Sequence, residues 1–218
     1  DGDRISAFGG IVAINGLVEA AAARELTSLF LECVVAPGFS PDAREILASK
    51  PNLRLLELSA AAVDAAGPDH VRSILGGLLV QDLDDRPCEP DTWTVATQRP
   101  PSIQEKRDLE FAWRLVRHVR SNAIVVARDG QSLGIGAGQM NRVGSARLAL
   151  EAAGDKAAGS VLASDGFFPF DDTVRLAAEH GIAAVIHPGG SLRDAESIQA
   201  CDELGMTMLL TGRRHFLH

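Results

Sequence analysis

One loop of the chain combines aromatic and acidic side chains in a way that suits a flat, polar ligand. Residues 165–172 read Asp-Gly-Phe-Phe-Pro-Phe-Asp-Asp, with three aromatic and three acidic residues between a predicted strand and a predicted helix. Aromatic rings can form a wall against a heterocycle, and a carboxylate accepts hydrogen bonds from its amino or hydroxyl groups. The structural alternative is a hydrophobic plug in which Asp171 or Asp172 caps the helix.

Arginines supply the basic side chains that an anionic ligand needs. Arg142 follows the glycine-rich segment 134–138 (Gly-Ile-Gly-Ala-Gly), and a guanidinium there can clamp a phosphate or carboxylate. The glycines either expose backbone N–H groups to such an anion or form only a tight turn. As a dinucleotide fingerprint the segment fails, because its third Gly comes one residue early, so a nicotinamide-dependent oxidoreductase has no further support. Arg213 and Arg214 form a second basic site, suited to a phosphate unless they lie in a solvated tail.

Two further loops carry groups that can face a ligand. Asn122 lies where a long predicted helix ends and a strand begins. Its amide either terminates the helix or stabilises a developing oxyanion. In the loop 187–191, Ser191 is predicted as a helix N-cap with Asp194 in the first turn, and the free N–H groups of such a helix start can hold a carbonyl or carboxylate.

The composition excludes several other classes of function. With 29 acidic and 21 basic residues, the formal charge of −8 gives no electrostatic reason to bind nucleic acid or an anionic membrane. No apolar run approaches the ~20 residues that span a bilayer, and no secretory segment opens the chain, so we expect a cytoplasmic protein. Cys33, Cys88 and Cys201 are odd in number and contain no Cys-x-x-Cys pair, which argues against disulfides and a zinc site. Cys201 falls on an apolar helix stripe and is predicted to be buried.

The elements that must position these loops alternate between strands and amphipathic helices, which predicts an α/β protein. The clearest helix is expected from Ile103 to about Arg120, because Ser102 and Glu105 form a capping box and an apolar face follows. That face contains Leu109, Ala112, Trp113, Val116 and Val119. The expected strands are 10–14, 33–36, 53–58, 78–81, 123–127, 133–135, 161–163, 183–186 and 206–210.

An internal repeat indicates two related modules. Residues 36–42 (Ala-Pro-Gly-Phe-Ser-Pro-Asp) and 164–171 (Ser-Asp-Gly-Phe-Phe-Pro-Phe-Asp) both follow a predicted strand and precede a helix and another strand. The same order of elements on both sides favours duplication of one α/β unit. The Asp- and Pro-rich stretch 81–101 is the expected connection. We therefore predict one domain at 1–98, which includes this connection, and a second at 99–218.

Six segments, in order, together resemble the family of phosphoribosylaminoimidazolecarboxamide formyltransferase with IMP cyclohydrolase, specifically its C-terminal transformylase part. They are Ser-Ala-Phe-Gly-Gly at 6–10, Ser-Asn-Ala-Ile at 121–124, Gly-Ile-Gly-Ala-Gly-Gln-Met-Asn-Arg at 134–142, Ser-Asp-Gly-Phe-Phe-Pro-Phe at 164–170, Pro-Gly-Gly-Ser at 188–191 and Arg-His-Phe-Leu-His at 214–218. The resemblance implies two cytidine-deaminase-like modules, the first incomplete at its N-terminus, without the deaminase zinc. It also implies transfer of a formyl group from 10-formyltetrahydrofolate to the amino group of 5-aminoimidazole-4-carboxamide ribonucleotide in purine biosynthesis.

The resemblance also assigns site residues by their place in these segments. Asn122 would lie near the formyl oxygen, and the whole set of nucleotide contacts would be Gly9, Glu32, Asn122, Arg142, Asp172 and Arg214. The folate side would be lined by Val143, Phe167, Ser191 and Leu192. The resemblance also implies that the ligands are a small-molecule nucleotide and a folate and that the protein is a homodimer. It implies no zinc or other transition metal, and it is compatible with a bound monovalent cation. The family's Lys-His acid/base pair and its cyclohydrolase domain lie upstream of the segment 6–10, so we expect the chain alone to be inactive. The alternative is a non-catalytic nucleotide-binding or regulatory module of the same fold.

Overall fold

The computed structural model describes residues 2–65 and 69–218, and these divide into two compact units. One unit contains Asp3–Leu83, and the other contains Asp84–His218 together with Gly2. The division falls near the start of the predicted connection 81–101. The predicted module boundary between residues 98 and 99 stays a prediction.

The unit Asp3–Leu83 is built on a three-stranded parallel sheet in the order β1-β3-β5. Helices α1 and α2 pack on it, and the core contains Val18, Ala23, Val34, Phe39 and Leu47. Helix α2 starts where the hydroxyl of Ser40 accepts a hydrogen bond from the N–H of Ala43, followed by Pro41 at the first helical position. The elements are β1 (Gly10–Ala13), β2 (Leu17–Val18), α1 (Ala20–Thr27), β3 (Leu31–Ala36), β4 (Gly38–Phe39), α2 (Pro41–Leu47), β5 (Arg54–Glu57), α3 (Ala60–Asp64), β6 (Asp69–Ile74) and β7 (Gly77–Asp82).

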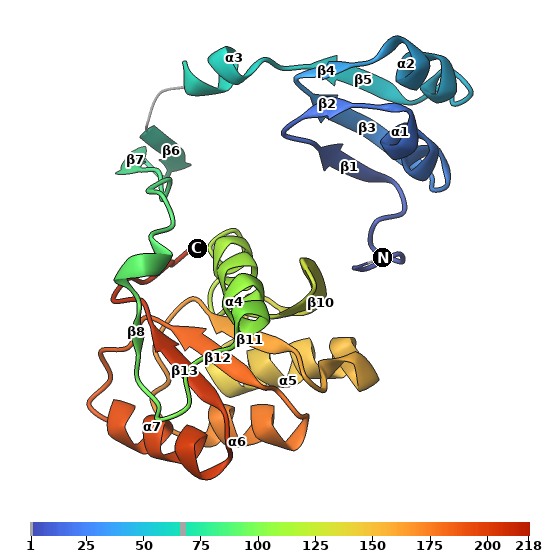
Figure 1. The fold of residues 1–218 in the computed structure, drawn as a ribbon. Helices are drawn as coiled ribbons and strands as arrows, with labels where there is room; N and C mark the ends of the chain where they lie inside the picture. Colours follow the sequence, from blue (N-terminus) through green and yellow to red (C-terminus); the bar gives the residue numbers. More distant parts are fainter. Residues whose placement is uncertain (1, 66–68) are drawn as a thin grey trace. The chain divides into compact units, whose positions relative to one another are not determined.

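The unit that ends at His218 is a six-stranded mixed sheet in the order β10-β9-β11-β12-β13-β8 (Figure 1). Strands β11, β12 and β13 are parallel to one another, whereas β9 runs antiparallel to β11. The elements are η1 (Pro90–Thr92), β8 (Thr94–Val95), α4 (Ile103–Val116), β9 (Ile124–Arg128), β10 (Gln131–Gly136), α5 (Arg142–Ala153), η2 (Gly154–Ala157), β11 (Val161–Ser164), α6 (Asp172–Glu179), β12 (Ala184–His187), α7 (Asp194–Glu203) and β13 (Thr207–Leu210).

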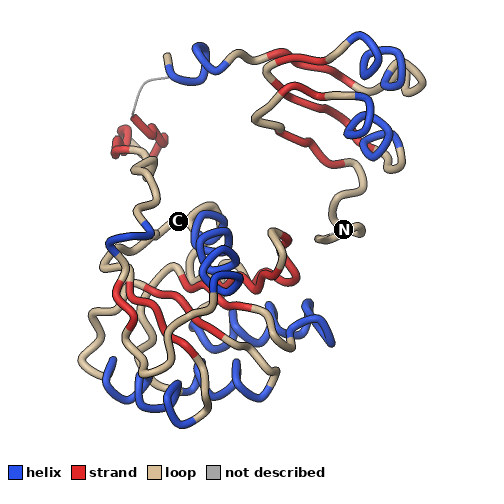
Figure 2. The backbone as a smooth tube through the Cα atoms, viewed as in Figure 1, coloured by secondary structure: helices blue, strands red, loops and turns tan. Residues whose placement is uncertain are grey.

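Helices cover both faces of this sheet, as Figure 2 shows. Alternate residues of β9 divide between two cores: Val125 and Ala127 pack against α4, whereas Ile124 and Val126 pack against the side of α5, α6 and α7. Strands buried on both faces read as continuous apolar runs, which is why this part of the sequence was predictable. Cys201 is fully buried in the second core, as predicted.

The structure confirms the α/β class and every predicted strand, with ends that shift by up to two residues. The two-residue strands β2, β4 and β8 were missed, because so short a segment has no readable period. Strand β6 was missed as well, since its sequence Asp-His-Val-Arg-Ser-Ile is mostly polar. The two segments of the internal repeat occupy equivalent places: Ala36 ends β3 and Ser164 ends β11, and each is followed by a helix and a parallel neighbouring strand.

The capping box at the start of α4 is confirmed in both directions, between Ser102 and Glu105. The predicted end at Arg120 is wrong, because the helix ends at Val116. Arg120 instead forms a parallel bridge with Leu217, so its backbone cannot continue the helix. Val119 is nevertheless buried, and the predicted apolar face is confirmed.

Candidate functional site

The predicted loops of the unit ending at His218 meet at one edge of its sheet. Strands β11, β12 and β13 are parallel, so the loops that follow Ser164, His187 and Leu210 leave from the same edge. Strand β9 runs the other way, and its first residue Ile124 pairs with Ser164 on one side and Gly136 of β10 on the other. The segment before β9, which holds Asn122, therefore lies at this edge too. We call it the carboxyl edge.

At the carboxyl edge, Arg142 lies in a buried network with Asp165 and Asn122. Arg142 is the first residue of α5 and only 8% exposed, and its Nη1 forms an ion pair with the fully buried Asp165. The same nitrogen donates to the hydroxyl of Ser164 at 3.0 Å, and Nη2 donates to Oδ1 of Asn122 at 2.9 Å. Charge-assisted bonds of this kind are roughly twice as strong as neutral ones. The network therefore fixes the position of the Asn122 amide.

Asn122 keeps one donor for a ligand. Its Nδ2 donates to the carbonyl oxygen of Gln139 at 2.8 Å, and its backbone carbonyl accepts from the hydroxyl of Ser145 at 2.9 Å. A side-chain amide nitrogen carries a second hydrogen, for which no acceptor exists among the described residues. Since both ends of the amide are anchored, that hydrogen has a defined direction.

Asp165 makes two further hydrogen bonds at the carboxyl edge, and one of its carboxylate oxygens has no partner among the described residues. Its Oδ1 accepts from the N–H of Ala123 at 3.1 Å, and its carbonyl accepts from the N–H of His215 at 3.0 Å. Its other carboxylate oxygen, Oδ2, is buried and has no partner in the part of the chain that is described. Leaving such an oxygen unsatisfied costs about 1–3 kcal/mol.

A chain of contacts connects Arg214 to this network. A Cβ built on Gly166 would lie 2.4 Å from Nη2 of Arg142 and 2.9 Å from Cε1 of Phe216, so only glycine lets these two side chains meet here. Arg214 then lies over the Phe216 ring, with its Cζ 5.2 Å from the ring centre. Arg214 is exposed, and it forms no ion pair with any described residue.

The remaining predicted residues of this unit lie in neighbouring loops or first turns of helices, and no hydrogen bond joins their side chains to the network. Asp172 is the exposed first residue of α6, and its Oδ1 accepts from the N–H of Thr173 at 2.7 Å. Val143 follows Arg142 in α5, Phe167 is half-buried in the loop after β11, and Leu192 is fully exposed after β12.

Of the two predicted helix caps, Asp171 takes the predicted position and Ser191 does not. Helix α7 has Arg193 as its N-cap, so Ser191 as N-cap is wrong. The Ser191 hydroxyl instead accepts from the N–H of Arg193 at 3.1 Å, which closes a turn before the helix starts. Asp171 occupies the N-cap position of α6 but makes no side-chain cap bond, since its carboxylate binds Nε of Arg175 at 2.6 Å.

Gly9 and Glu32 belong to the unit Asp3–Leu83, so their assignment to the same site stays a prediction. Gly9 has a φ of +74° and donates its N–H to the carbonyl of Phe30 at 2.8 Å. Glu32 lies inside β3 rather than before it, and its carboxylate pairs with Arg54 at 2.7 Å.

The glycines at 134 and 136 have a packing role, which neither alternative for the glycine-rich segment predicted. Both lie within β10, and a Cβ on either would come to 1.9 Å from a carbonyl oxygen of α5, that of Ala149 or that of Ser145. They let the helix approach the strand closely, so they are not an exposed phosphate turn. Gly138, with a φ of +65°, forms the actual turn before α5.

Two residues of the edge were not assigned as site residues from sequence: Asp165, the partner of Arg142, and Phe216. The acidic residue directly after β11 was a usable signal for the first. No sequence rule indicates that Phe216 packs beside Gly166. His187, the last residue of β12, is buried at the same edge. Burial, with a smaller contribution from the charge of Arg142, lowers its pKa to about 3. Its ring lies 4.5 Å from that of Phe168.

Comparison with known proteins gives the family. The model described as "AICARFT/IMPCHase bienzyme" matches residues 1–152. The chain belongs to this family. Proteins named "Bifunctional purine biosynthesis protein PurH" are 84% identical to it in Parasynechococcus marenigrum (strain WH8102) and in Synechococcus sp. (strain CC9902), and 63% identical in Prochlorococcus marinus (strain NATL1A). Each match covers 100% of this chain and 42% of the relative, so the chain spans less than half of their length.

A solved structure titled "Structural genomics, protein ybgI, unknown function" is 16% identical, with a TM-score of 0.22 over 95% of this chain and 74% of that one. A score this low gives no information about the fold.

Across the described residues, no helix is both long and apolar enough to span a membrane. Within the same residues, His, Cys, Asp and Glu side chains form no group of three that could hold a metal ion.

Proposed function

We propose that the chain is the C-terminal transformylase part of a bifunctional purine-biosynthesis enzyme, which transfers a formyl group from 10-formyltetrahydrofolate to the amino group of 5-aminoimidazole-4-carboxamide ribonucleotide. Family membership supports this assignment, as does the single feature on which it depends: the anchored network of Asn122, Arg142 and Asp165 at the carboxyl edge. The fold is proposed to be two duplicated cytidine-deaminase-like modules, 1–98 and 99–218. The matching order of elements after β3 and β11 supports the duplication.

The reaction requires stabilisation of a negatively charged oxygen. The amino nitrogen attacks the formyl carbon, and the carbonyl π electrons move to oxygen. The tetrahedral species collapses when the C=O bond re-forms and the bond from the formyl carbon to N10 of the folate breaks. The proton lost by the amine is balanced by the proton gained at N10 of the departing tetrahydrofolate. The remaining Nδ2 hydrogen of Asn122 is proposed to donate to this oxygen. A preorganised donor of this kind contributes about 2.7–4 kcal/mol to lowering the barrier. No group of the carboxyl edge is assigned as the base, and the chain alone is proposed to bind its ligands without turnover.

The two arginines of the edge are proposed to act differently. Arg142 is already neutralised by Asp165, and its Nε–H and one Nη2–H remain for a neutral carbonyl such as the carboxamide of the ribonucleotide. Arg214 has its full charge available and is proposed to bind the 5′-phosphate. Asp172, Gly9 and Glu32 are proposed as further nucleotide contacts. Val143, Phe167, Ser191 and Leu192 are proposed to line the folate side, and a homodimer is proposed as the working form.

Calorimetric titration of the purified chain with the ribonucleotide tests the proposal. Arg214→Gln is expected to weaken binding by about 10- to 100-fold, because one charge-assisted phosphate contact contributes about 1.5–3 kcal/mol. The matched control is Arg147→Gln, which removes the same charge from an exposed position of α5. Equal affinity of the Arg214→Gln variant and the wild type would contradict the phosphate assignment.

A folate analogue separates this function from a non-catalytic nucleotide-binding module. The transformylase proposal requires the analogue to bind the ribonucleotide-saturated chain, and Phe167→Ala to weaken that binding. A chain that binds the nucleotide and shows no heat with the analogue would favour the non-catalytic module.

A further inference from the structure

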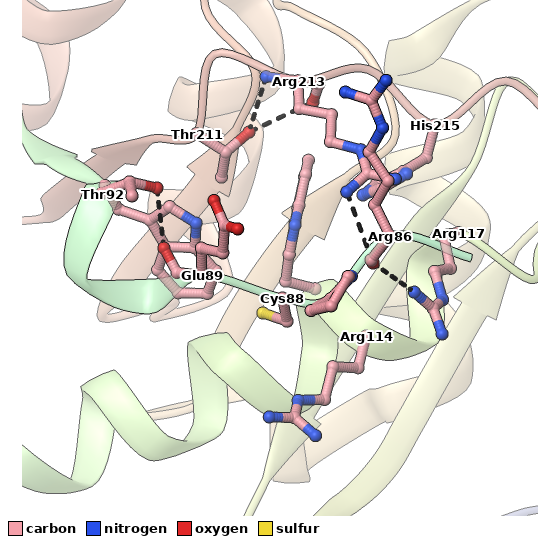
Figure 3. Close-up of a pocket in the computed structure, with 12 residues that line it drawn as sticks. Arg86, Cys88, Glu89, Thr92, Arg114, Arg117, Thr211, Arg213 and His215 are labelled. Carbon is pink, nitrogen blue, oxygen red and sulfur yellow. Dashed lines mark hydrogen bonds between the residues drawn. The ribbon is translucent and has the colours of Figure 1, made fainter. Parts of the chain in front are cut away.

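A second basic cavity is lined by none of the side chains assigned to the nucleotide and the folate. It has a volume of about 200 Å³, and its walls come from the segment 86–93, the end of α4 and the residues after β13 (Figure 3). Arg86, Arg114, Arg117 and Arg213 all line it, in a chain that contains 21 basic and 29 acidic residues. One acidic residue, Glu89, also lines the cavity, so guanidinium groups outnumber carboxylates in its wall.

Two of these arginines are neutralised by neighbouring carboxylates. Arg213 pairs with Asp84, which also binds His215, and Arg114 pairs with Glu110. Burial alone would raise the pKa of Asp84, yet the hydrogen bonds and charges of His215 and Arg213 hold it below its ordinary value. Asp84 is therefore ionised and already engaged at neutral pH.

The other two arginines have no such partner. Arg86 and Arg117 take part in no ion pair with any residue that the structure describes. Nη1 of Arg117 donates to the backbone carbonyl of Arg86 at 3.3 Å, which holds the two residues together without neutralising either charge. Burial, and after it the charge of Arg117, lowers the pKa of the adjacent His118.

The size and walls of the cavity limit its occupant. The cavity volume of about 200 Å³ is enough for one or two phosphate groups. The rear wall is rigid: Trp113 is 4% exposed, and its ring lies 4.6 Å from that of His215 and 6.5 Å from that of Trp93. Cys88 also lines the cavity, but burial raises the pKa of its thiol, so it offers no ready nucleophile.

Position at a helix end explains part of the basic character. Arg114 and the C-cap Arg117 lie where the dipole of α4 is negative, and such residues stabilise a helix by about 0.3–1 kcal/mol. This explanation does not apply to Arg86 or Arg213, which come from other segments and line the same cavity.

We infer that this cavity is an anion-binding site for a small phosphate or diphosphate group, held by Arg86 and Arg117 with Arg213 beside them. The group is either a free inorganic anion or the phosphate end of a larger metabolite. None of the residues that line the cavity is assigned to the transformylase reaction, and the cavity has a binding, not a catalytic, role.

The test uses the fact that the chain contains only two tryptophans, both in the cavity wall. Tryptophan fluorescence of the purified chain is titrated with pyrophosphate and, separately, with inorganic phosphate, against sodium chloride of equal ionic strength. We expect a saturable change with pyrophosphate that chloride does not reproduce. Saturation by inorganic phosphate at similar concentrations would identify the free anion, and a much weaker response would identify a diphosphate-bearing ligand.

Variants localise the response. Arg117→Gln and Arg86→Gln are each expected to weaken pyrophosphate binding at least tenfold. Arg147→Gln, which removes the same charge from an exposed position outside the cavity, is expected to leave it within twofold. The inference is overturned by a non-saturable response, by equal quenching of free tryptophan amide, or by loss of the response in Arg214→Gln but not in Arg117→Gln. Because Arg214→Gln is also the variant that tests ribonucleotide binding, each hypothesis can fail without the other.

Discussion

Replacing Asp165 with Asn removes one charge from the buried network at the carboxyl edge while keeping the shape of the side chain. Oδ1 of the Asn can still accept from the N–H of Ala123, so the change isolates the ion pair with Arg142. Arg142 is 8% exposed and would be left as an uncompensated buried cation. Breaking a buried pair in this way costs about 3–5 kcal/mol, a large part of the ~5–15 kcal/mol that stabilises a typical domain.

The assay is urea denaturation followed by tryptophan fluorescence. Both tryptophans belong to the unit that ends at His218, so the signal reports on unfolding of the unit that contains Asp165. We expect the midpoint to fall in proportion to a loss of about 3–5 kcal/mol, with no change in the slope.

A double-mutant cycle gives the refuting result. In Asp165→Asn/Arg142→Met, both charges are absent, and the double variant is expected to be more stable than Asp165→Asn alone. If Asp165→Asn costs less than ~1 kcal/mol, or if the double variant loses the sum of the two single losses, the ion pair does not hold the edge together. The argument that it positions Asn122 would then fail.

Three further outcomes are expected. The pKa of His187 is about 3 in the folded protein against about 6.5 when unfolded, so between these values the unfolded chain binds a proton that the folded one does not. The free energy of unfolding is therefore highest above pH 6.5 and falls by up to ~1.4 kcal/mol per pH unit below it. His187→Phe should flatten this dependence in denaturation curves recorded between pH 4 and 7. Gly136→Ala places a Cβ 1.9 Å from the carbonyl oxygen of Ser145 and should lower the free energy of unfolding by more than the ~1–3 kcal/mol typical of overpacking. In the same assay, Gly130→Ala should lower it by only about 1 kcal/mol, because this position faces open space and only its positive φ disfavours alanine. Ser102→Ala should lower stability by about 1 kcal/mol through the capping box of α4, and a loss below 0.3 kcal/mol by urea titration would contradict that role.

Strands β9, β11, β12 and β13 were predictable because each is a compact apolar run that is almost entirely buried. The run at 123–127 is an example: its residues alternate between the two cores, and any of them facing water would have interrupted the pattern. The start of α4 was predictable for a different reason, since the Ser102 and Glu105 bonds are local to one turn. Its end was not, because Arg120 leaves the helix to pair with Leu217, nearly a hundred positions away in the sequence.

The candidate site shows the same limit. Sequence motifs placed Asn122, Arg142 and the loop after β11 at functional positions, and the parallel strands bring them to one edge. The sequence did not indicate that Arg142 pairs with Asp165, or that Gly166 is small to admit Arg142 and Phe216 together. Those relations depend on side-chain packing between segments distant in sequence, which no local period records.

The pairing of Arg142 changes which arginine should bind a phosphate. Had both guanidiniums been free, the more buried one would be the stronger ligand, because an ion pair gains strength as water is excluded. The charge of Arg142, however, is already neutralised by Asp165. A phosphate at this position would be attracted little by the nearly neutral pair and would be repelled by the carboxylate. Arg214 forms no ion pair with any described residue and lies over the Phe216 ring, and a cation–π contact of about 0.5–1 kcal/mol at an exposed position orients the side chain without neutralising it. The structure therefore favours a division in which Asp165 and Arg142 hold the Asn122 amide rigid, and Arg214 supplies the charge that attracts the ligand.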